Sequence, residues 1–201
     1  MATCGRRPSR RRELAALACA LVCACDPDAA TPVDRAAVPD VEACDGVRQW
    51  PRAASEQAAA LLQAVDDARA QPQRCGALGA FPAAAALVPD GALTCAARVQ
   101  ARFLADGAPL GHAGIDDDAP DDRVAAAGYD ASLSSELVAL GDVAPDAIVD
   151  ALWQASAAHC AALHGPAWVH AGAAFVAATP DDTGEDDDEP RDVFVLVLAA
   201  P

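Results

Sequence analysis

Apolar residues recur at helical spacing in three parts of the chain. Between residues 55 and 70 they return every three or four positions, which places them on one face of a helix. The same spacing predicts a second helix over 93–105 and a third over 145–153, which opens on a proline that suits a first helical turn. The residues expected to face the core are Ala58, Leu61, Leu62, Val65, Ala68, Ala96, Val99, Phe103, Leu104, Ile148, Val149, Leu152 and Trp153.

Two later segments have the pattern of strands. Residues 167–177 alternate between two faces, as a strand does. Residues 192–199 form a continuous apolar run, which is typical of a strand buried on both faces. The acidic segment 180–191 between them contains Gly and Pro and predicts a solvated loop.

A short helix is expected after Pro120. Proline suits the first turn, Asp121 and Asp122 favour the positive end of the helix dipole, and Gly128 suits the end of the helix. A calcium-binding loop is the alternative for these aspartates. Such a loop needs alternating ligands and a closing glutamate, which this segment lacks.

The N-terminal segment has the order of an export signal. Arginines precede an apolar run over residues 14–24, and Cys25 follows it directly. The run is too short to span a membrane, which takes about 20 apolar residues. We therefore predict a lipoprotein signal peptide over residues 1–24, with lipid attached to Cys25. A plain secretory signal is the alternative.

The rest of the chain divides into a tether and a domain. Residues 25–50 are rich in Pro, Asp and Ala and lack apolar periodicity, so they are expected to form a flexible tether. Residues 51–201 are long enough for one folded domain with a substantial core. We expect that domain to be a monomer.

The charge of the chain excludes some partners. All 14 basic residues are arginines, and they face 30 acidic residues. Without residues 1–24, which hold five arginines and one glutamate, the net charge is −20. Such a chain repels nucleic acid phosphates and anionic lipid headgroups. Nucleic acid is therefore not an expected partner, and contact with a membrane is expected only through the lipid anchor.

Four cysteines remain beyond Cys25, namely Cys44, Cys75, Cys95 and Cys160. An even number in an exported chain predicts two disulfides. Three pairings are possible, and their spacing does not choose among them. A zinc site is the competing interpretation, but no Cys-x-x-Cys follows Cys25.

Two runs of residues resemble one family. Trp153, Ser156, His159, Cys160 and Pro166 fall in register with Trp-x-x-Ser-Pro-Gly-His-Cys/Arg-x-Asn-Ile-Met/Leu-x-Pro, a motif of bacterial members of the CAP superfamily, also called SCP-like or Tpx-1/PR-1-like domains. A second run aligns without a gap with Ser-His-Thr-Gly-x-Asp-Gly-x-x-Pro-x-Asp-Arg-x-x-x-x-Gly-Tyr of the same family. Its matching residues are His112, Gly114, Asp116, Pro120, Asp122, Arg123, Gly128 and Tyr129.

The resemblance implies a fold and a cleft. CAP domains are α+β proteins built as an α-β-α sandwich, and many gather two histidines and two glutamates in one cleft. Carried over by position, this chain keeps His112, Glu136 and His159, and has Ser156 in place of the second glutamate. The resemblance also implies a disulfide between Cys75 and Cys95, and with it one between Cys44 and Cys160.

The chemistry of the cleft has two interpretations. In one, His112, His159 and Glu136 hold a divalent metal such as zinc, with His170 as a further ligand because it replaces an acid common in the family. In the other, the two histidines bond to Glu136 and nearby backbone, and His170 lies at the rim. The second is favoured, because polar neighbours common in the family are replaced by Leu137 and Leu196.

The sequence thus predicts an extracytoplasmic lipoprotein that faces the periplasm or the cell exterior. Its expected role is to bind an unidentified envelope or extracellular ligand, or to act as a structural protein. The alternative is a metal-dependent hydrolase of peptide or ester bonds that uses the same cleft. The chemistry of the residues favours the role without catalysis.

Overall fold

The computed structural model describes residues 37–178 and 192–201. The predicted signal peptide, Cys25 and the acidic loop lie outside these residues. The helices are η1 (Glu42–Cys44), α2 (Arg52–Arg69), η2 (Gly76–Leu78), α3 (Gly91–Ala105), η3 (Ile115–Asp117), α4 (Pro120–Ala126), α5 (Pro145–Ala147), η4 (Ile148–Trp153) and α6 (Ala157–Leu163). The strands are β1 (Gln73–Arg74), β2 (Ala80–Phe81), β3 (Val88–Pro89), β4 (Leu133–Leu140), β5 (His170–Val176) and β6 (Val193–Ala200).

The central sheet has four strands in the order β3-β5-β6-β4. β3 runs parallel to β5, whereas β6 is antiparallel to both of its neighbours. The register places Glu136 of β4 opposite Val197 of β6, which in turn lies opposite Gly172 of β5. β4 is therefore an edge strand, and its one partner in the sheet is β6.

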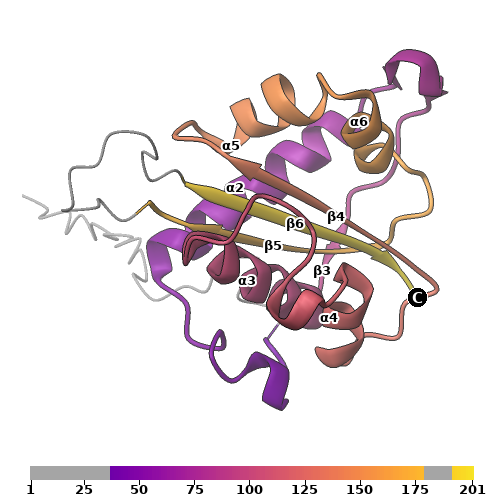
Figure 1. Ribbon diagram of the computed structural model, residues 1–201. Coiled ribbons are helices and arrows are strands. Elements are labelled where there is room, and N and C mark those ends of the chain that lie inside the picture. Colours follow the sequence, from indigo (N-terminus) through magenta and orange to yellow (C-terminus); the bar gives the residue numbers. More distant parts are fainter. Residues whose placement is uncertain (1–36, 179–191) are drawn as a thin grey trace, which may run out of the picture.

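Helices cover both faces of this sheet. One core cluster joins residues of α2, η4 and α6 to one face of β5 and β6, and a second joins α3 and α4 to the other face. Figure 1 shows the sheet between these two helical layers. The predicted α+β class is confirmed, and the arrangement is an α-β-α sandwich.

β6 is the centre of the core. Val195 and Val197 contact the α3 side, whereas Phe194, Leu196 and Leu198 contact the α2 side, and all five are fully or almost fully buried. A strand enclosed in this way has no polar face, which explains the continuous apolar run in its sequence. The predicted strand over 192–199 is confirmed.

The third predicted helix is not a regular α-helix. A single α-helical turn, α5, is followed by a π-helix, η4, over Ile148–Trp153. Ile148, Val149 and Trp153 are buried as expected, but Leu152 is 43% exposed. Because π-helical hydrogen bonds reach from i to i+5, the wider turn brings Trp153 rather than Leu152 beneath Ile148. The prediction for Leu152 was therefore wrong.

The domain begins before residue 51. Cys44 and Val47 are buried against α3, and the Trp50 ring lies 5.2 Å from the Arg98 guanidinium and 6.0 Å from that of Arg102. Residues 37–50 therefore belong to the folded domain, and the predicted tether over 25–50 was wrong for this part. These residues are held by a disulfide, which composition alone does not reveal.

The disulfides pair differently from the prediction. Cys44 bonds to Cys95, and Cys75 bonds to Cys160. Cys95 lies on α3 and packs with Cys44, whereas Cys160 lies on α6, which packs against η2 beside Cys75. The predicted bond between Cys75 and Cys95 was wrong because these residues belong to opposite sides of the sheet. Both disulfides are typical of oxidising, extracytoplasmic compartments.

Among residues 37–178 and 192–201, no helix has the length and apolar character to span a bilayer.

Close contact between α3 and β5 depends on Gly172. A Cβ atom at this position would lie 2.1 Å from the backbone of both Leu93 and Thr94. Backbone atoms cannot move aside as a flexible side chain can. The helix and the strand can therefore approach this closely only if residue 172 has no side chain.

We predict that Gly172→Ala lowers the free energy of unfolding by about 1–3 kcal/mol, the usual range for overpacking. Gly141→Ala is the matched control, because its added Cβ would meet no atom closer than 3.6 Å. Urea denaturation followed by circular dichroism measures both variants. Equal losses of unfolding free energy in the two variants would show that α3 can shift away from β5 at little energetic cost.

Candidate functional site

A buried carboxylate lies at the centre of the candidate site. Glu136 points from β4 to the α3 and α4 side of the sheet, and its side chain is 1% exposed. Its Oε1 lies 2.9 Å from His112 Nδ1, and its Oε2 accepts a hydrogen bond from Arg123 Nη2 at 2.9 Å. Both carboxylate oxygens are therefore satisfied.

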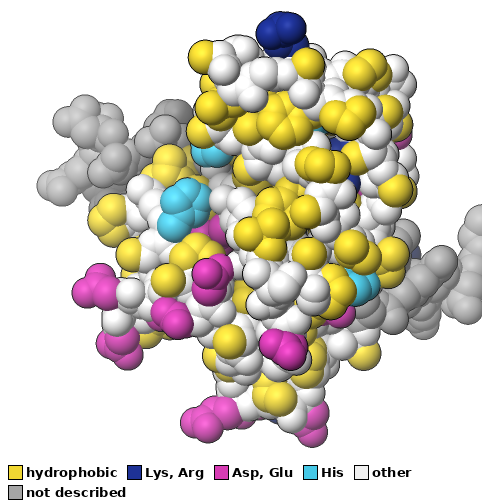
Figure 2. Space-filling model, turned by 90° about the vertical axis from the view of Figure 1, so that its right-hand side faces the viewer, with side chains coloured by type: hydrophobic (Ala, Val, Ile, Leu, Met, Phe, Trp, Pro, Cys, Tyr) yellow, Lys and Arg dark blue, Asp and Glu magenta, His cyan; other side chains and the backbone are white. Residues whose placement is uncertain are grey.

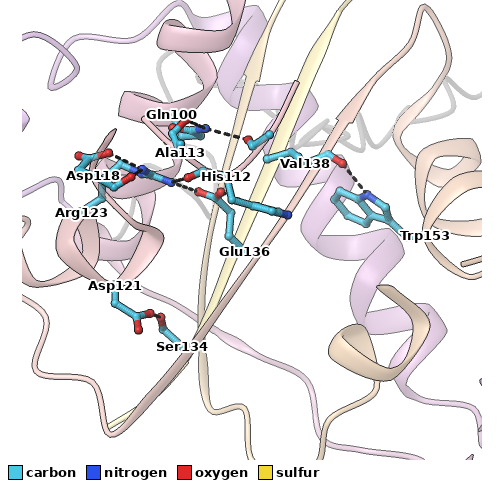
Figure 3. Close-up of polar contacts among 11 residues, drawn as sticks. Gln100, His112, Ala113, Asp118, Asp121, Arg123, Ser134, Glu136, Val138 and Trp153 are labelled. Atoms are coloured by element: carbon cyan, nitrogen blue, oxygen red, sulfur yellow. Dashed lines mark hydrogen bonds and ion pairs between the residues drawn. The ribbon is translucent and has the colours of Figure 1, made fainter. Parts of the chain in front are cut away.

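Arg123 connects this carboxylate to the preceding loop. Its side chain is 2% exposed, and its Nη1 donates to Asp118 Oδ1 at 2.6 Å. Its Nη2 also donates to the backbone carbonyl of His112 at 2.9 Å. Figure 3 shows Arg123 between Asp118 and Glu136. We call His112, Asp118, Arg123 and Glu136 the His112 cluster.

Gly114 and Gln100 shape the loop that carries His112. Gln100 Nε2 donates to the carbonyls of Gly111 at 3.0 Å and Ala113 at 3.3 Å. A Cβ on Gly114 would lie 2.2 Å from Asp118 Oδ1 and 2.6 Å from Arg123 Nη1. Only glycine leaves room for the ion pair between Asp118 and Arg123. The packing around this ion pair therefore explains why the motif has a glycine at position 114.

The His112 imidazole is held on one side and open on the other. Its side chain is 48% exposed, although its Glu136 partner is buried. When Nδ1 carries the proton and donates it to the carboxylate, Nε2 presents a lone pair. A carboxylate that fixes the tautomer and orientation of a histidine prepares it to bind a further group.

His159 approaches from the opposite helical layer. It lies on α6, where the Ser156 side chain caps the first turn and accepts a hydrogen bond from the His159 amide at 3.4 Å. Burial, and then the nearby His112, lower the pKa of His159 below its usual value. The lowered pKa favours the neutral form of His159, and His112 is near enough to contribute to the shift. The helix that carries His159, α6, packs against the edge strand β4.

His170 does not belong to this site. It opens β5, two strands away from β4, and its Nδ1 lies 2.7 Å from the hydroxyl of Tyr129. Two strand spacings amount to about 10 Å, which is too far for a shared ligand position. The predicted place of His170 as a further ligand of the cleft was therefore wrong.

The predicted metal set does not come together. Within the described ranges, no group of three or more His, Cys, Asp or Glu side chains is placed to hold an ion. Both Glu136 oxygens are engaged by His112 and Arg123. The bond between His112 and Glu136 agrees with the other interpretation of the sequence, in which these two residues are hydrogen-bonded partners.

Sequence reasoning missed the roles of Arg123, Asp118 and Gln100. Arg123 was noted as part of a motif, but its burial and its two acidic partners were not predicted. The local sequence held no signal for this burial, because an arginine three residues after Pro120 can lie on either side of a short helix. Gln100 stood within the apolar face of the second predicted helix and is fully buried.

Two grooves lie away from the His112 cluster. One, of about 530 Å³, lies beside α2, α5 and η4 and is lined by alanine side chains together with polar ones such as Gln63, Asp67 and Asp150. The other, of about 840 Å³, is lined mainly by apolar residues that include Trp50, Leu104 and Phe175. Figure 2 shows histidine side chains on a face that combines apolar and acidic surface. The candidate site is therefore identified by its polar side chains and not by the volume of a cavity.

No family model matches this chain, and no curated protein matches it. An outer surface protein from Borrelia burgdorferi is similar in structure, with 22% sequence identity and a TM-score of 0.45. The match covers 55% of this chain and 74% of that chain. This likeness is too weak to support an inference about function.

We predict that Arg123→Met lowers the free energy of unfolding by about 3–5 kcal/mol, because the buried Glu136 carboxylate loses its arginine partner and keeps only its contact with His112. Adding Glu136→Met should restore much of this loss, since no unpaired charge then remains in the core. Thermal and urea denaturation at neutral pH measure these changes.

The matched control is Arg52→Met, which breaks an exposed ion pair with Glu56. Its effect should stay within about 1 kcal/mol. If Arg123→Met were as mild as this control, the buried pair would not stabilise the fold.

Proposed function

We propose that this chain is a divergent member of the CAP superfamily that binds a ligand at the cell envelope through the His112 cluster and His159. The supporting observation is that motif residues far apart in sequence interact directly. His112, Arg123 and Glu136 come from a loop, a helix and a strand, and they form one hydrogen-bonded unit. The three-layer fold is compatible with this family.

The geometry favours binding because the exposed imidazole is held in place before any ligand arrives. His112 is fixed through its ring and through its carbonyl, so little side-chain entropy remains to be lost on binding. Ser156 lies one helical turn from His159 and adds a hydroxyl near the same edge of the sheet. When Nδ1 of His112 carries the proton, its Nε2 accepts a hydrogen bond, so in that form the site suits a ligand with donor groups.

The alternative of a metal-dependent hydrolase finds less support. Such a site usually has three protein ligands around the ion. His112 and His159 supply two imidazoles, and Glu136 is already engaged on both oxygens by neighbouring side chains. The residues present therefore do not fit a catalytic zinc centre, and we assign no catalytic residue.

We further propose that the protein is anchored by lipid on Cys25 and faces the periplasm or the cell exterior. The two disulfides support an extracytoplasmic place. The apolar run before Cys25 supports processing at that residue. In this arrangement the chain from Cys25 to the first described residues would connect the anchor to the domain.

We predict that ligands of this protein bind at the edge of β4. Titration of the ¹⁵N-labelled protein with a library of small polar fragments, followed by amide correlation spectra, tests this. The largest shifts should fall on residues 111–118 and 156–160. His112→Ala should weaken such binding at least tenfold, because the exposed imidazole is then lost.

The control for that experiment is Gln49→Ala, which alters the lining of the Trp50 groove and leaves the His112 cluster unchanged. Fragment shifts that gather around the Trp50 groove, and that persist in His112→Ala, would contradict the proposed binding site.

Mass spectrometry of the protein purified from its native membrane tests the anchor. We expect the first residue to be Cys25 and to carry lipid, and Cys25→Ser to release the protein from the membrane fraction. A mature chain that begins elsewhere and has no lipid would support the plain secretory signal instead. Digestion without reductant should return peptides that join Cys44 to Cys95 and Cys75 to Cys160.

A further inference from the structure

A second histidine of the α6 region is buried without a partner. His164 follows α6 directly, is 0% exposed, and has no hydrogen-bond partner for either ring nitrogen within residues 37–178 and 192–201. A buried polar group that lacks a partner is uncommon in folded proteins and calls for an explanation. The proposed ligand site does not use this residue.

The C-terminal end of α6 is held by a buried arginine. Arg69 of α2 is 1% exposed, and its Nη1 donates to the carbonyls of Leu163 at 2.7 Å and Gly165 at 3.0 Å. Its Nη2 donates to the carbonyl of Ala85 at 3.3 Å. The guanidinium thus binds the backbone on both sides of His164. Arg69 is accordingly the cation nearest to the imidazole.

The charges around His164 leave an added proton without compensation. Asp66 lies three residues before Arg69 on α2 and accepts a hydrogen bond from the Leu87 amide at 2.9 Å. Its negative charge favours the protonated form of Arg69. Three other elements pack against α6, and one of them, η2, has no titratable residue. Glu136 of β4 lies on the face of the sheet that points away from α6, and Asp150 of η4 is exposed. A protonated His164 would therefore be a second buried cation next to Arg69.

We propose that His164 is an acid-sensitive latch, and that its protonation releases the C-terminal end of α6 from Arg69. Repulsion between two adjacent buried cations opens the contact between Arg69 and the carbonyls of Leu163 and Gly165. α6 carries His159, so acidification disturbs one of the two imidazoles of the candidate site. This last consequence rests on the proposed function, whereas the latch itself does not.

The direction of the pH effect follows from burial. Burial, and then Arg69, lower the pKa of His164 below its usual value of 6.5. The unfolded or locally opened segment takes up a proton near that usual value, whereas the closed form does not. The stabilisation is therefore fully present above about pH 6.5 and is lost as the pH falls from there towards the pKa of the closed form.

Asp66 has the opposite effect on stability. Burial raises the pKa of Asp66 above its usual 3.8, so at this group a fall in pH favours the closed form, whereas at His164 it favours the open form. His159, which also lies on α6, has a lowered pKa and titrates in the same direction as His164. A test must therefore separate the two histidines.

Amide hydrogen exchange of the ligand-free protein between pH 7.5 and 5.5 tests the latch. We expect the protection of α6 amides, such as that of Cys160, to fall by up to tenfold per pH unit, the limit for uptake of one proton. Amides of α3 should lose less. His164→Met should remove the pH dependence in α6, because an apolar side chain of similar size fills the site without titrating.

His159→Gln is the matched control and should keep the acid sensitivity of α6. Equal pH dependence in the wild type and His164→Met would overturn the proposal, as would a parallel loss of protection in α3 and α6. If His164→Met does not fold, the pH titration of the His164 ring signals in NMR spectra of the wild type tests the proposal instead. A ring that titrates at its ordinary pKa while α6 stays protected would refute the latch. Because no ligand is used, failure of the proposed binding site leaves this result unaffected.

Discussion

The buried ion pair between Arg123 and Glu136 is the constraint on which the candidate site depends. Taking two charges out of water is favourable only when each is fully hydrogen-bonded. Both Nη atoms of Arg123 are bonded, to Asp118, the His112 carbonyl and Glu136, whereas its buried Nε has no partner among the described residues. The same contacts set the path of the loop before α4. The position of His112 is therefore a consequence of how a buried charge is satisfied.

The edge of the sheet explains why two helical layers can share one site. β4 has a single partner in the sheet, β6, so its other side is free of a strand. His112 reaches this edge from the α3 and α4 layer, and His159 reaches it from α6 in the other layer. The bond between Cys75 and Cys160, together with Arg69, fixes α6 on its own side. Loops and helix ends thus supply chemistry that the apolar core could not.

Some strands could not be predicted from pattern. β4 contains both Glu136 and the apolar run that follows it, and only its pairing along the whole of β6 makes it a strand. β3 has two residues and forms through its bridge to β5. The widened turn at η4 likewise reversed the expected burial of Leu152. Short elements and local shifts of this kind depend on tertiary contacts rather than on periodicity.

The sequence by itself determined the helices over α2 and α3, the strands β5 and β6, the mixed α+β class and the motif residues of the His112 cluster. Periodicity and local motifs are properties of neighbouring residues, so a linear chain displays them. The tertiary structure decided which cysteines pair, where the domain begins, and that His170 stands apart from His112 and Glu136. Those outcomes depend on which layer each segment joins, and the layers bring together residues that are distant along the chain.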